Sequence, residues 1–148
     1  MMREARLKML EMTAGRVAAI HDSFLGVRHG PQVFIDGSCA VFASLSTDAT
    51  VRRYELDLLC ELAEKKQGCG TFTICERVDR ESAGLSADSF SLSRDGEHIA
   101  DEWRVLTDLV AYQLLAAFKA MSLGLAPDNP SPSRIINRVV SGVKIYET

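Results

Sequence analysis

Apolar segments of two lengths alternate along the chain, and this alternation constrains its fold more than any other feature. Three segments are long and periodic enough for helices, and the shorter apolar runs have the length of strands. The predicted helices cover residues 3–14, 51–66 and 101–123, and the predicted strands cover residues 16–21, 39–46, 71–75 and 89–93. Because parallel strands need a crossover connection, this order predicts an α/β fold with a mostly parallel sheet.

The size of the chain suits one domain. It has 148 residues, of which 47% are hydrophobic, so it can bury one core of ordinary size. We therefore expect residues 1–148 to form a single domain. The polar stretch 79–88 is interpreted as an exposed connector within that domain.

Charge and hydropathy exclude several classes of partner. A net charge of -3 and the lack of a Lys/Arg stripe argue against nucleic acid. Residues 1–9 interleave charged and apolar side chains, unlike a secretory signal. The long apolar stretch 105–125 contains Asp108, Gln113 and Lys119, which a bilayer would accommodate only at a high cost. The sequence therefore predicts a cytoplasmic protein with no membrane partner.

The four cysteines show no spacing typical of a metal site. Cys39, Cys60, Cys69 and Cys75 form no C-x-x-C pair, and their neighbours are mostly apolar. Buried, reduced and inert thiols are therefore expected, without disulfides and without a bound metal.

Two of the predicted helices are apolar on more than one side. In the first, a polar ridge of Glu4, Lys8 and Glu11 lies between two apolar flanks, so its own sheet could cover only one of them. The long helix at 101–123 has only a narrow polar stripe, formed by Asp108, Tyr112 and Lys119. Deep burial of both helices is predicted, and with it a homodimer or higher homo-oligomer that forms through them.

Two side chains are candidates for proton chemistry. Glu11 borders two apolar flanks, where partial desolvation would raise its pKa towards the range of a general base. An ordinary surface carboxylate paired with Lys8 or Arg3 is the alternative. His29 lies in the turn Arg28-His29-Gly30-Pro31, where Gly30 and Pro31 can hold an imidazole rigidly. A plain surface histidine is again the alternative.

Several segments, taken in order, carry a family resemblance. They are residues 7–11 around Glu11, 25–31 around His29, 34–36, 52–59 beginning Arg-Arg-Tyr-Glu, and the tail segments 127–132 and 137–140. Together they resemble the C-terminal sugar isomerase (SIS) domain of the AgaS-type phosphosugar isomerases. These proteins are called tagatose-6-phosphate ketose/aldose isomerases or galactosamine-6-phosphate deaminase/isomerases. The resemblance runs along essentially the whole chain.

The resemblance implies a three-layer α/β/α, flavodoxin-like domain, normally present twice per subunit. It implies a sugar phosphate as substrate and neither a metal nor an organic cofactor. Such a domain opens with a strand and a Gly-rich turn before its first helix, whereas this chain starts on the helix. We therefore expect an N-terminally truncated C-terminal SIS domain that lacks its first strand.

The resemblance also implies roles for the two candidates. The chain is similar, more distantly, to the isomerase half of glucosamine-6-phosphate synthase. There the glutamate matching Glu11 moves a proton between C1 and C2, and the histidine matching His29 helps to open the sugar ring from the neighbouring subunit. Arg28, beside that histidine, is a candidate substrate contact. The synthase carries a lysine in an Asn-x-x-Lys pattern, at the position that Val140 occupies here.

The hydroxyl-rich segment 44–50 follows a predicted strand and precedes a helix, which is the local context of a phosphate loop. The loop in the first lobe of such enzymes reads Ser-x-Ser-Gly-x-Thr, but this segment lacks the glycine and has Asp48 where a phosphate would lie. We interpret it as a degenerate copy, with Thr50 as the helix N-cap. Ser44, Ser46 and Thr50 are candidate substrate contacts.

The resemblance leads to one leading function and two alternatives. The leading function is that of a phosphosugar aldose–ketose isomerase domain, with or without deamination, that acts through a carboxylate proton shuttle after ring opening. The alternatives are a noncatalytic sugar-phosphate-binding or regulatory module, and a dimerising fragment that is inactive. The parent protein is expected to be an enzyme, and the chain alone is expected to be inactive.

Overall fold

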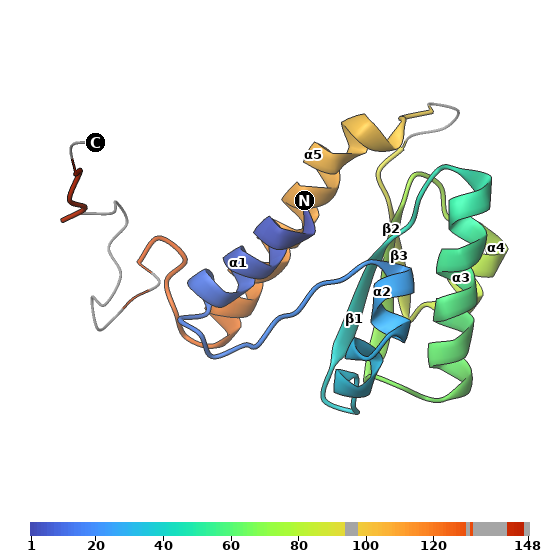
Figure 1. The fold of residues 1–148 in the computed structure, drawn as a ribbon, viewed down its shortest axis with the longest axis horizontal. Coiled ribbons are helices and arrows are strands. Elements are labelled where there is room, and N and C mark those ends of the chain that lie inside the picture. The colour runs from blue at the N-terminus through green and yellow to red at the C-terminus, as the bar shows by residue number, and fades with distance from the viewer. Residues whose placement is uncertain (94–97, 130, 132–141, 147–148) are drawn as a thin grey trace. The chain divides into compact units, whose positions relative to one another are not determined.

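The computed structural model describes residues 1–93, 98–129, 131 and 142–146. The chain divides into two compact units (Figure 1). Unit 1 consists of His21–Leu109 with Met1, and unit 2 consists of Met2–Ile20 with Val110–Thr148. Each unit has its own arrangement of helices, and the sheet belongs to unit 1.

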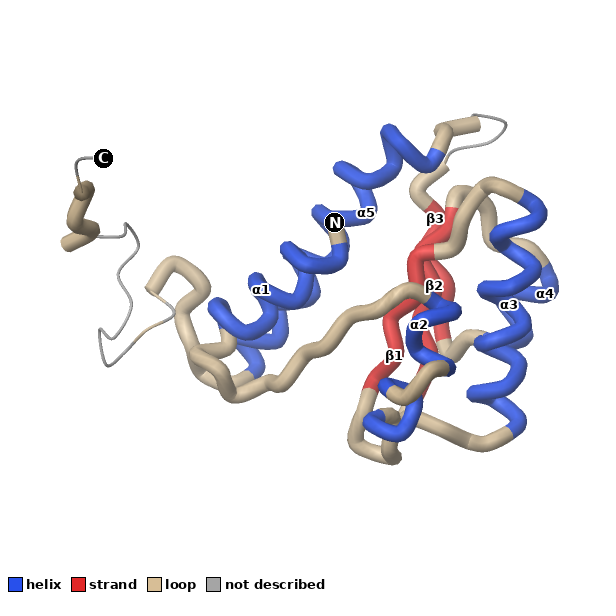
Figure 2. The backbone as a smooth tube through the Cα atoms, in the orientation of Figure 1, coloured by secondary structure: helices blue, strands red, loops and turns tan. Residues whose placement is uncertain are grey.

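Three parallel strands form the sheet of unit 1 (Figure 2). They are β1 (Ala40–Ser44), β2 (Gly70–Cys75) and β3 (Asp88–Ser91), in the order β1-β2-β3. The α/β fold with a parallel sheet is thereby confirmed, and no strand precedes β1 among residues 1–39. The predicted strand at 16–21 is wrong, because this stretch is a loop that follows Gly15 (φ 72) and pairs with no neighbouring strand.

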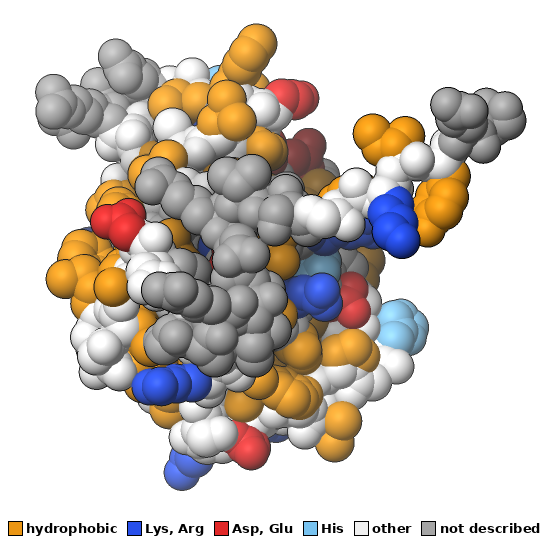
Figure 3. Space-filling view, turned by 90° about the vertical axis from the view of Figure 1, so that its left-hand side faces the viewer, with side chains coloured by type: hydrophobic (Ala, Val, Ile, Leu, Met, Phe, Trp, Pro, Cys, Tyr) orange, Lys and Arg blue, Asp and Glu red, His pale blue; other side chains and the backbone are white. Residues whose placement is uncertain are grey.

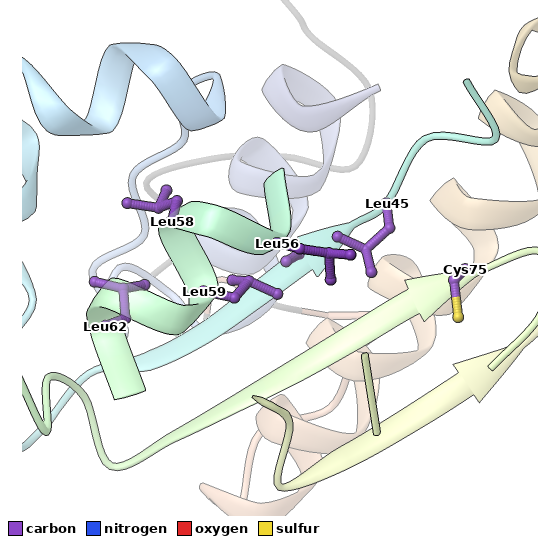
Figure 4. Packing of buried hydrophobic residues seen from close by; sticks show 7 residues of the cluster. Leu45, Leu56, Leu58, Leu59, Leu62 and Cys75 are labelled. Atoms are coloured by element: carbon purple, nitrogen blue, oxygen red, sulfur yellow. The ribbon is translucent and has the colours of Figure 1, made fainter. Parts of the chain in front are cut away.

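Helix α3 (Ala49–Glu64) crosses from β1 to β2 and buries one face of the sheet. Figure 4 shows Leu56 and Leu59 of α3 on the side of the helix that faces the strands. The core cluster consists of Ala43, Leu45, Leu56, Leu58, Leu59, Leu62 and Cys75. The α3 leucines are spaced so that several are three or four positions apart, which gives the helix an apolar side that can pack on the sheet.

Three short helices lie beside this core. They are α2 (Phe24–Arg28), the 3-10 helix η1 (Pro31–Phe34) and α4 (Arg80–Leu85). The sequence predicted an exposed connector at 79–88, and most of these residues are exposed, but the segment also contains α4, which a reciprocal capping box of Asp79 and Ser82 starts.

The opposite face of the sheet carries a stacked aromatic pair and the start of helix α5 (Asp101–Ser122). Phe42 and Phe72, paired in register, have ring centroids 5.0 Å apart. Side chains alternate along a strand, so Ser44 points to the same face as Phe42. A hydrogen bond joins Ser44 to Asp108 of α5. The first turns of α5 therefore form the third layer at this end of the sheet.

Arg104 anchors the start of α5 to the end of β1. Its Nη1 donates to the carbonyl oxygen of Leu45 at 2.8 Å and to Asp101 at 3.2 Å, and its Nη2 lies 3.2 Å from Asp108. The side chains of Arg104 and Asp108 are only 3% and 5% exposed. Such a buried ion pair needs both members, because either one alone would be an uncompensated charge in the interior.

Unit 2 contains α1 (Met2–Met12) and the second half of α5. The hydroxyl of Thr13 donates to the carbonyl oxygen of Met9 at 2.6 Å, and Arg16 donates to the carbonyl oxygen of Leu123 at 3.4 Å. Within α5 the buried positions Tyr112, Ala116 and Ala120 are four residues apart and form one stripe.

The expectation that α5 is buried nearly all round is wrong. Its outer face, defined as Val110, Leu114, Phe118 and Met121, is 51% to 64% exposed. Asp108 and Tyr112, which the sequence placed on a polar stripe, are instead buried. Figure 3 shows hydrophobic side chains exposed on one side of the molecule. In the part of the chain that the structure describes, the buried positions of α5 (Arg104, Asp108, Tyr112, Ala116 and Ala120) lie on one side of the helix only.

The cysteines are all free thiols, but they are not all buried. Cys75 is fully buried in the core, Cys39 and Cys60 are half-buried, and Cys69 is exposed. Burial raises the pKa of the Cys75 thiol above its usual value. The expectation of buried cysteines is therefore wrong for Cys69, which directly precedes β2 at the end of that strand where the residues are only half-buried.

We predict that Arg104→Ala lowers the free energy of unfolding by about 3–5 kcal/mol, because it leaves the buried Asp108 carboxylate without its ionic partner. Urea denaturation followed by circular dichroism measures the change. The control is Arg53→Ala, which removes an exposed guanidinium from α3 and should cost less than about 0.5 kcal/mol. Equal losses in the two variants would contradict the anchoring role of Arg104.

Candidate functional site

Ser44 ends β1, Ser46 lies in the loop that follows, and Thr50 lies in the first turn of α3, all at the carboxyl end of the sheet. In open α/β sheets this end is where ligands bind. All three predicted contacts therefore lie at the end of the sheet expected for a ligand. What decides their availability is the set of partners that they already have.

A carboxylate from α5 already binds this loop. Asp101 accepts hydrogen bonds from the hydroxyls of Ser46 and Thr47 and from the backbone N–H of Thr47, the last two at 3.0 Å. Although burial alone would raise the pKa of Asp101, these hydrogen bonds and the charge of Arg104 hold it below the usual value. The Asp101 carboxylate thus binds the loop hydroxyls and the N–H group that a ligand anion would otherwise bind.

The N-terminus of α3 is also satisfied from within the chain. The Asp48 side chain accepts from the backbone N–H of Thr50 at 2.8 Å and of Val51 at 2.9 Å. The predicted N-cap at Thr50 is therefore wrong by two residues. A carboxylate at position 48 reaches the free N–H groups of the first turn and also interacts favourably with the helix dipole.

Glu55 and Arg52 hold the loop from the α3 side. The backbone N–H of Ser46 donates to Glu55 at 2.7 Å, and Arg52 joins the Ser46 carbonyl oxygen (3.4 Å) to Asp79 (2.7 Å). Burial raises the pKa of the Glu55 carboxyl, against the effect of the Ser46 hydrogen bond. The loop therefore takes its shape from side chains on both flanking helices.

A cavity of about 310 Å³ opens beside this loop. It is lined by Ser46, Thr47, Arg52, Glu76, Arg77, Asp79 and His98. Most of its charges are already paired: Arg52 binds Asp79, and His98 lies 2.7 Å from Glu76. Internal pairing of this kind leaves little net charge for an anionic ligand.

Arg28 and His29 lie at a different place in unit 1. Arg28 ends α2, His29 is its C-cap, and Arg28 contacts Asp57 and Glu61 of α3, each at 3.3 Å. Asp57 follows Asp48 by nine residues, which is about 13 Å along a helix. The structure therefore does not bring Arg28 together with the hydroxyls of the β1–α3 loop.

Glu11 lies near the end of α1 in unit 2. Its carboxylate accepts a hydrogen bond from Lys8 at 2.8 Å, and this bond raises the pKa of the Lys8 ammonium. Of the two interpretations of Glu11, the structure contains the pairing with Lys8. A side chain 38% exposed keeps room for a further partner.

Two other predictions concern the C-terminal tail and a bound metal. The tail around Asn137 and Val140 lies outside the described residues. Among the residues that the structure describes, no group of three or more His, Cys, Asp and Glu side chains could hold a metal ion.

Sequence reasoning missed the residues that organise the loop. Asp101, Arg104 and Asp108 are spaced by three and four residues, so they share one side of α5. That spacing was a usable signal, but the long apolar pattern around it concealed it. Glu55 and Arg52 carried no comparable signal, because charged residues on a helix are usually solvated.

Curated proteins similar to the chain share one name. No family model matches the chain. It is 37% identical over 143 residues to D-galactosamine-6-phosphate deaminase AgaS of Shewanella sp. (strain ANA-3), covering 97% of the chain and 33% of that protein. It is also 37% identical over 145 residues to D-galactosamine-6-phosphate deaminase AgaS of Escherichia coli O157:H7, covering 97% and 37%. The chain thus spans about a third of the length of the curated relatives it matches.

Solved structures agree with these relatives. A provisionally named tagatose-6-phosphate ketose/aldose isomerase from Clostridium novyi NT matches with a TM-score of 0.87 and 36% identity, over 97% of the chain and 37% of that protein. Tagatose-6-phosphate ketose/aldose isomerase from Escherichia coli matches with a TM-score of 0.82 and 31% identity, over 98% and 35%. The resemblance to the AgaS-type proteins is thereby confirmed along nearly the whole chain.

Proposed function

We propose that the chain is the C-terminal SIS domain of a phosphosugar aldose–ketose isomerase, acting on a tagatose-6-phosphate or galactosamine-6-phosphate type of substrate. The similarity to both named groups over 97% or more of the chain is the observation that supports this proposal. Release of ammonia is a further step if the substrate carries an amino group. The proposal includes a cytoplasmic location and residues 1–148 as one domain.

Glu11 and His29 have complementary duties in the proposed reaction. Conversion of an aldose to a ketose needs a base that takes the proton from C2 and returns it to C1, and one carboxylate can do both. Before that step an imidazole can give a proton to the ring oxygen, because its pKa lies near neutrality. Both side chains are reachable from solvent, with Glu11 half-buried and His29 exposed.

In this proposal the β1–α3 loop is not the phosphate-binding site. Its N–H groups and hydroxyls already bind Asp101, Asp48 and Glu55, so an incoming phosphate would have to displace carboxylates. The phosphate would then be held elsewhere in the longer protein. Ser44, Ser46 and Thr50 as substrate contacts stay predictions.

The two alternatives make different demands on the same residues. A noncatalytic sugar-phosphate-binding module would need the binding contacts but not Glu11, and a dimerising fragment would need neither. The paired state of Glu11 with Lys8 is compatible with each of them. Turnover in a longer protein separates the catalytic proposal from both alternatives.

The first prediction concerns Glu11 in a hybrid enzyme, in which the chain replaces the matching segment of the Shewanella deaminase. Glu11→Gln should lower turnover by at least about 100-fold with little change in sugar-phosphate binding, because only the proton shuttle is lost. Steady-state assays of ammonia release and isomerisation measure turnover.

The matched control is Glu4→Gln, which also removes a partner of Lys8 from α1 and should leave turnover unchanged. Unchanged turnover in the Glu11 variant would contradict the proposed role. A folded hybrid without any turnover would favour the noncatalytic alternatives.

A second prediction concerns the chain by itself. Calorimetric titration with galactosamine 6-phosphate should show a dissociation constant no tighter than about 1 mM. Galactosamine without the phosphate should behave alike, because the loop amides are occupied by carboxylates. Nanomolar affinity for the phosphate ester would show that a phosphate site is present after all.

We also propose that two copies of the chain associate through α1 and the outer face of α5. Phe118 is 64% exposed and Leu114 is 51% exposed, and they continue one apolar stripe along the helix. A second copy presents the same stripe, so a symmetric interface could bury both. These exposed side chains are the support for the proposal.

Phe118→Glu should convert the dimer to a monomer, because association would bury an unpaired carboxylate in an apolar interface, at a high desolvation cost. Size-exclusion chromatography with light scattering measures the mass. Lys119→Gln is the control, since it changes the net charge by the same amount beside that face and should preserve the dimer. A wild-type chain that is monomeric at high concentration would refute the proposal.

A further inference from the structure

The turn that carries His29 has little to hold its imidazole directly. The backbone N–H of His29 donates to the carbonyl oxygen of Gly26 at 3.0 Å, which closes α2. Gly30 follows with φ 146, and Pro31 starts η1. No hydrogen bond or ion pair of the His29 imidazole is present within the described part of the chain. The direction of the side chain therefore depends on what fixes the turn on its two sides.

One carboxylate fixes both sides. Glu61 of α3 places Oε2 3.3 Å from Nη2 of Arg28, the residue before His29. Its Oε1 accepts from the Gln32 side chain at 3.0 Å, three residues after His29. The two oxygens of Glu61 thus hold the two flanks of the turn against α3.

Neighbouring contacts reinforce this arrangement without replacing it. Among the described residues, Asp57 pairs with Arg28 on one flank of the turn, and Gln67 is joined to Gln32 on the other flank at 2.9 Å. The Nε of Arg28 is buried without a partner, so its guanidinium is held through Nη2 alone. Glu61 is therefore the one residue of this cluster that contacts both flanks.

The charge of Glu61 suits this task. Hydrogen bonds from Lys65 and Gln32 lower the pKa of its carboxyl, so it is an ionised acceptor near neutral pH. Its side chain is 27% exposed and that of Arg28 is 30% exposed, so water only partly screens the pair. The hydrogen bond from Gln32 to Glu61 is also stronger than one between neutral groups, because its acceptor is ionised.

We propose that Glu61 is a positioning residue for His29, and that it orients the imidazole by holding Arg28 and Gln32 at once. The proposal rests on the proposed function only for the catalytic role of the His29 imidazole. The contacts of Glu61 with Arg28 and Gln32 are present in unit 1 whatever that role is. It predicts that loss of Glu61 loosens the turn while α3 stays folded. Alanine is suitable for the test because it is the best helix former.

The test measures amide hydrogen exchange by NMR in the 148-residue chain. Glu61→Ala should speed the exchange of the His29 and Gly30 amides by about fivefold or more, because opening of the turn becomes easier. Gln32→Ala removes one flank only and should have a smaller effect. Glu64→Ala is the matched control, because Glu64 is on the same helix but does not contact the turn.

The hybrid enzyme supplies a second measurement. There Glu61→Ala should lower kcat several-fold with little change in KM, and Glu64→Ala should change neither. Unchanged exchange at His29 in the Glu61 variant would overturn the proposal whatever the activity. Faster exchange without a change in kcat, in a hybrid whose turnover requires His29, would overturn the link to catalysis.

Failure of the proposed function has a different signature. If His29→Gln leaves turnover intact, the imidazole is not the ring opener, and the exchange experiment still decides whether Glu61 holds the turn.

Discussion

The guanidinium of Arg104 is the contact on which the carboxyl edge of the sheet depends. It binds the carbonyl group of Leu45, the first residue after β1, and two carboxylates of its own helix, and both Arg104 and Asp108 are buried. One of those carboxylates, Asp101, continues to Ser46 and Thr47. The position of α5, the shape of the loop and the electrostatics of that edge therefore follow from one cluster of charges.

In many α/β proteins, anion binding and catalysis take place at the same end of the sheet, but in this chain the candidate groups for the two lie apart. The loop at the end of the first strand has the hydroxyls and amides of an anion site, yet the chain supplies the anions itself through Asp101 and Asp48. Glu11 and His29 lie outside the cluster and are reachable from solvent. The proposed proton-transfer residues and the internally satisfied loop are thus separate features of the chain.

Much of the fold could be predicted from the sequence because it depends on local patterns. Periodicity located α3 and β2 to within two residues, and the crossover rule gave parallel pairing. The loop chemistry could not be predicted, since Asp101 meets Thr47 across 54 residues. α5 was misjudged for a related reason: its pattern was apolar nearly all round, but the side that packs contains Arg104 and Asp108. Short α4 was missed because its stability comes from a capping box rather than from an apolar face.

Gly30 shows how backbone geometry alone can restrict sequence drift. A Cβ built there would meet no atom within 4 Å, so the site is open to any side chain as far as volume is concerned. Its φ of 146 nevertheless suits glycine almost exclusively. Gly37 also has open space around it, with no such backbone demand. A side chain at position 37 would therefore meet neither a steric nor a backbone obstacle, whereas position 30 favours glycine through its φ angle alone.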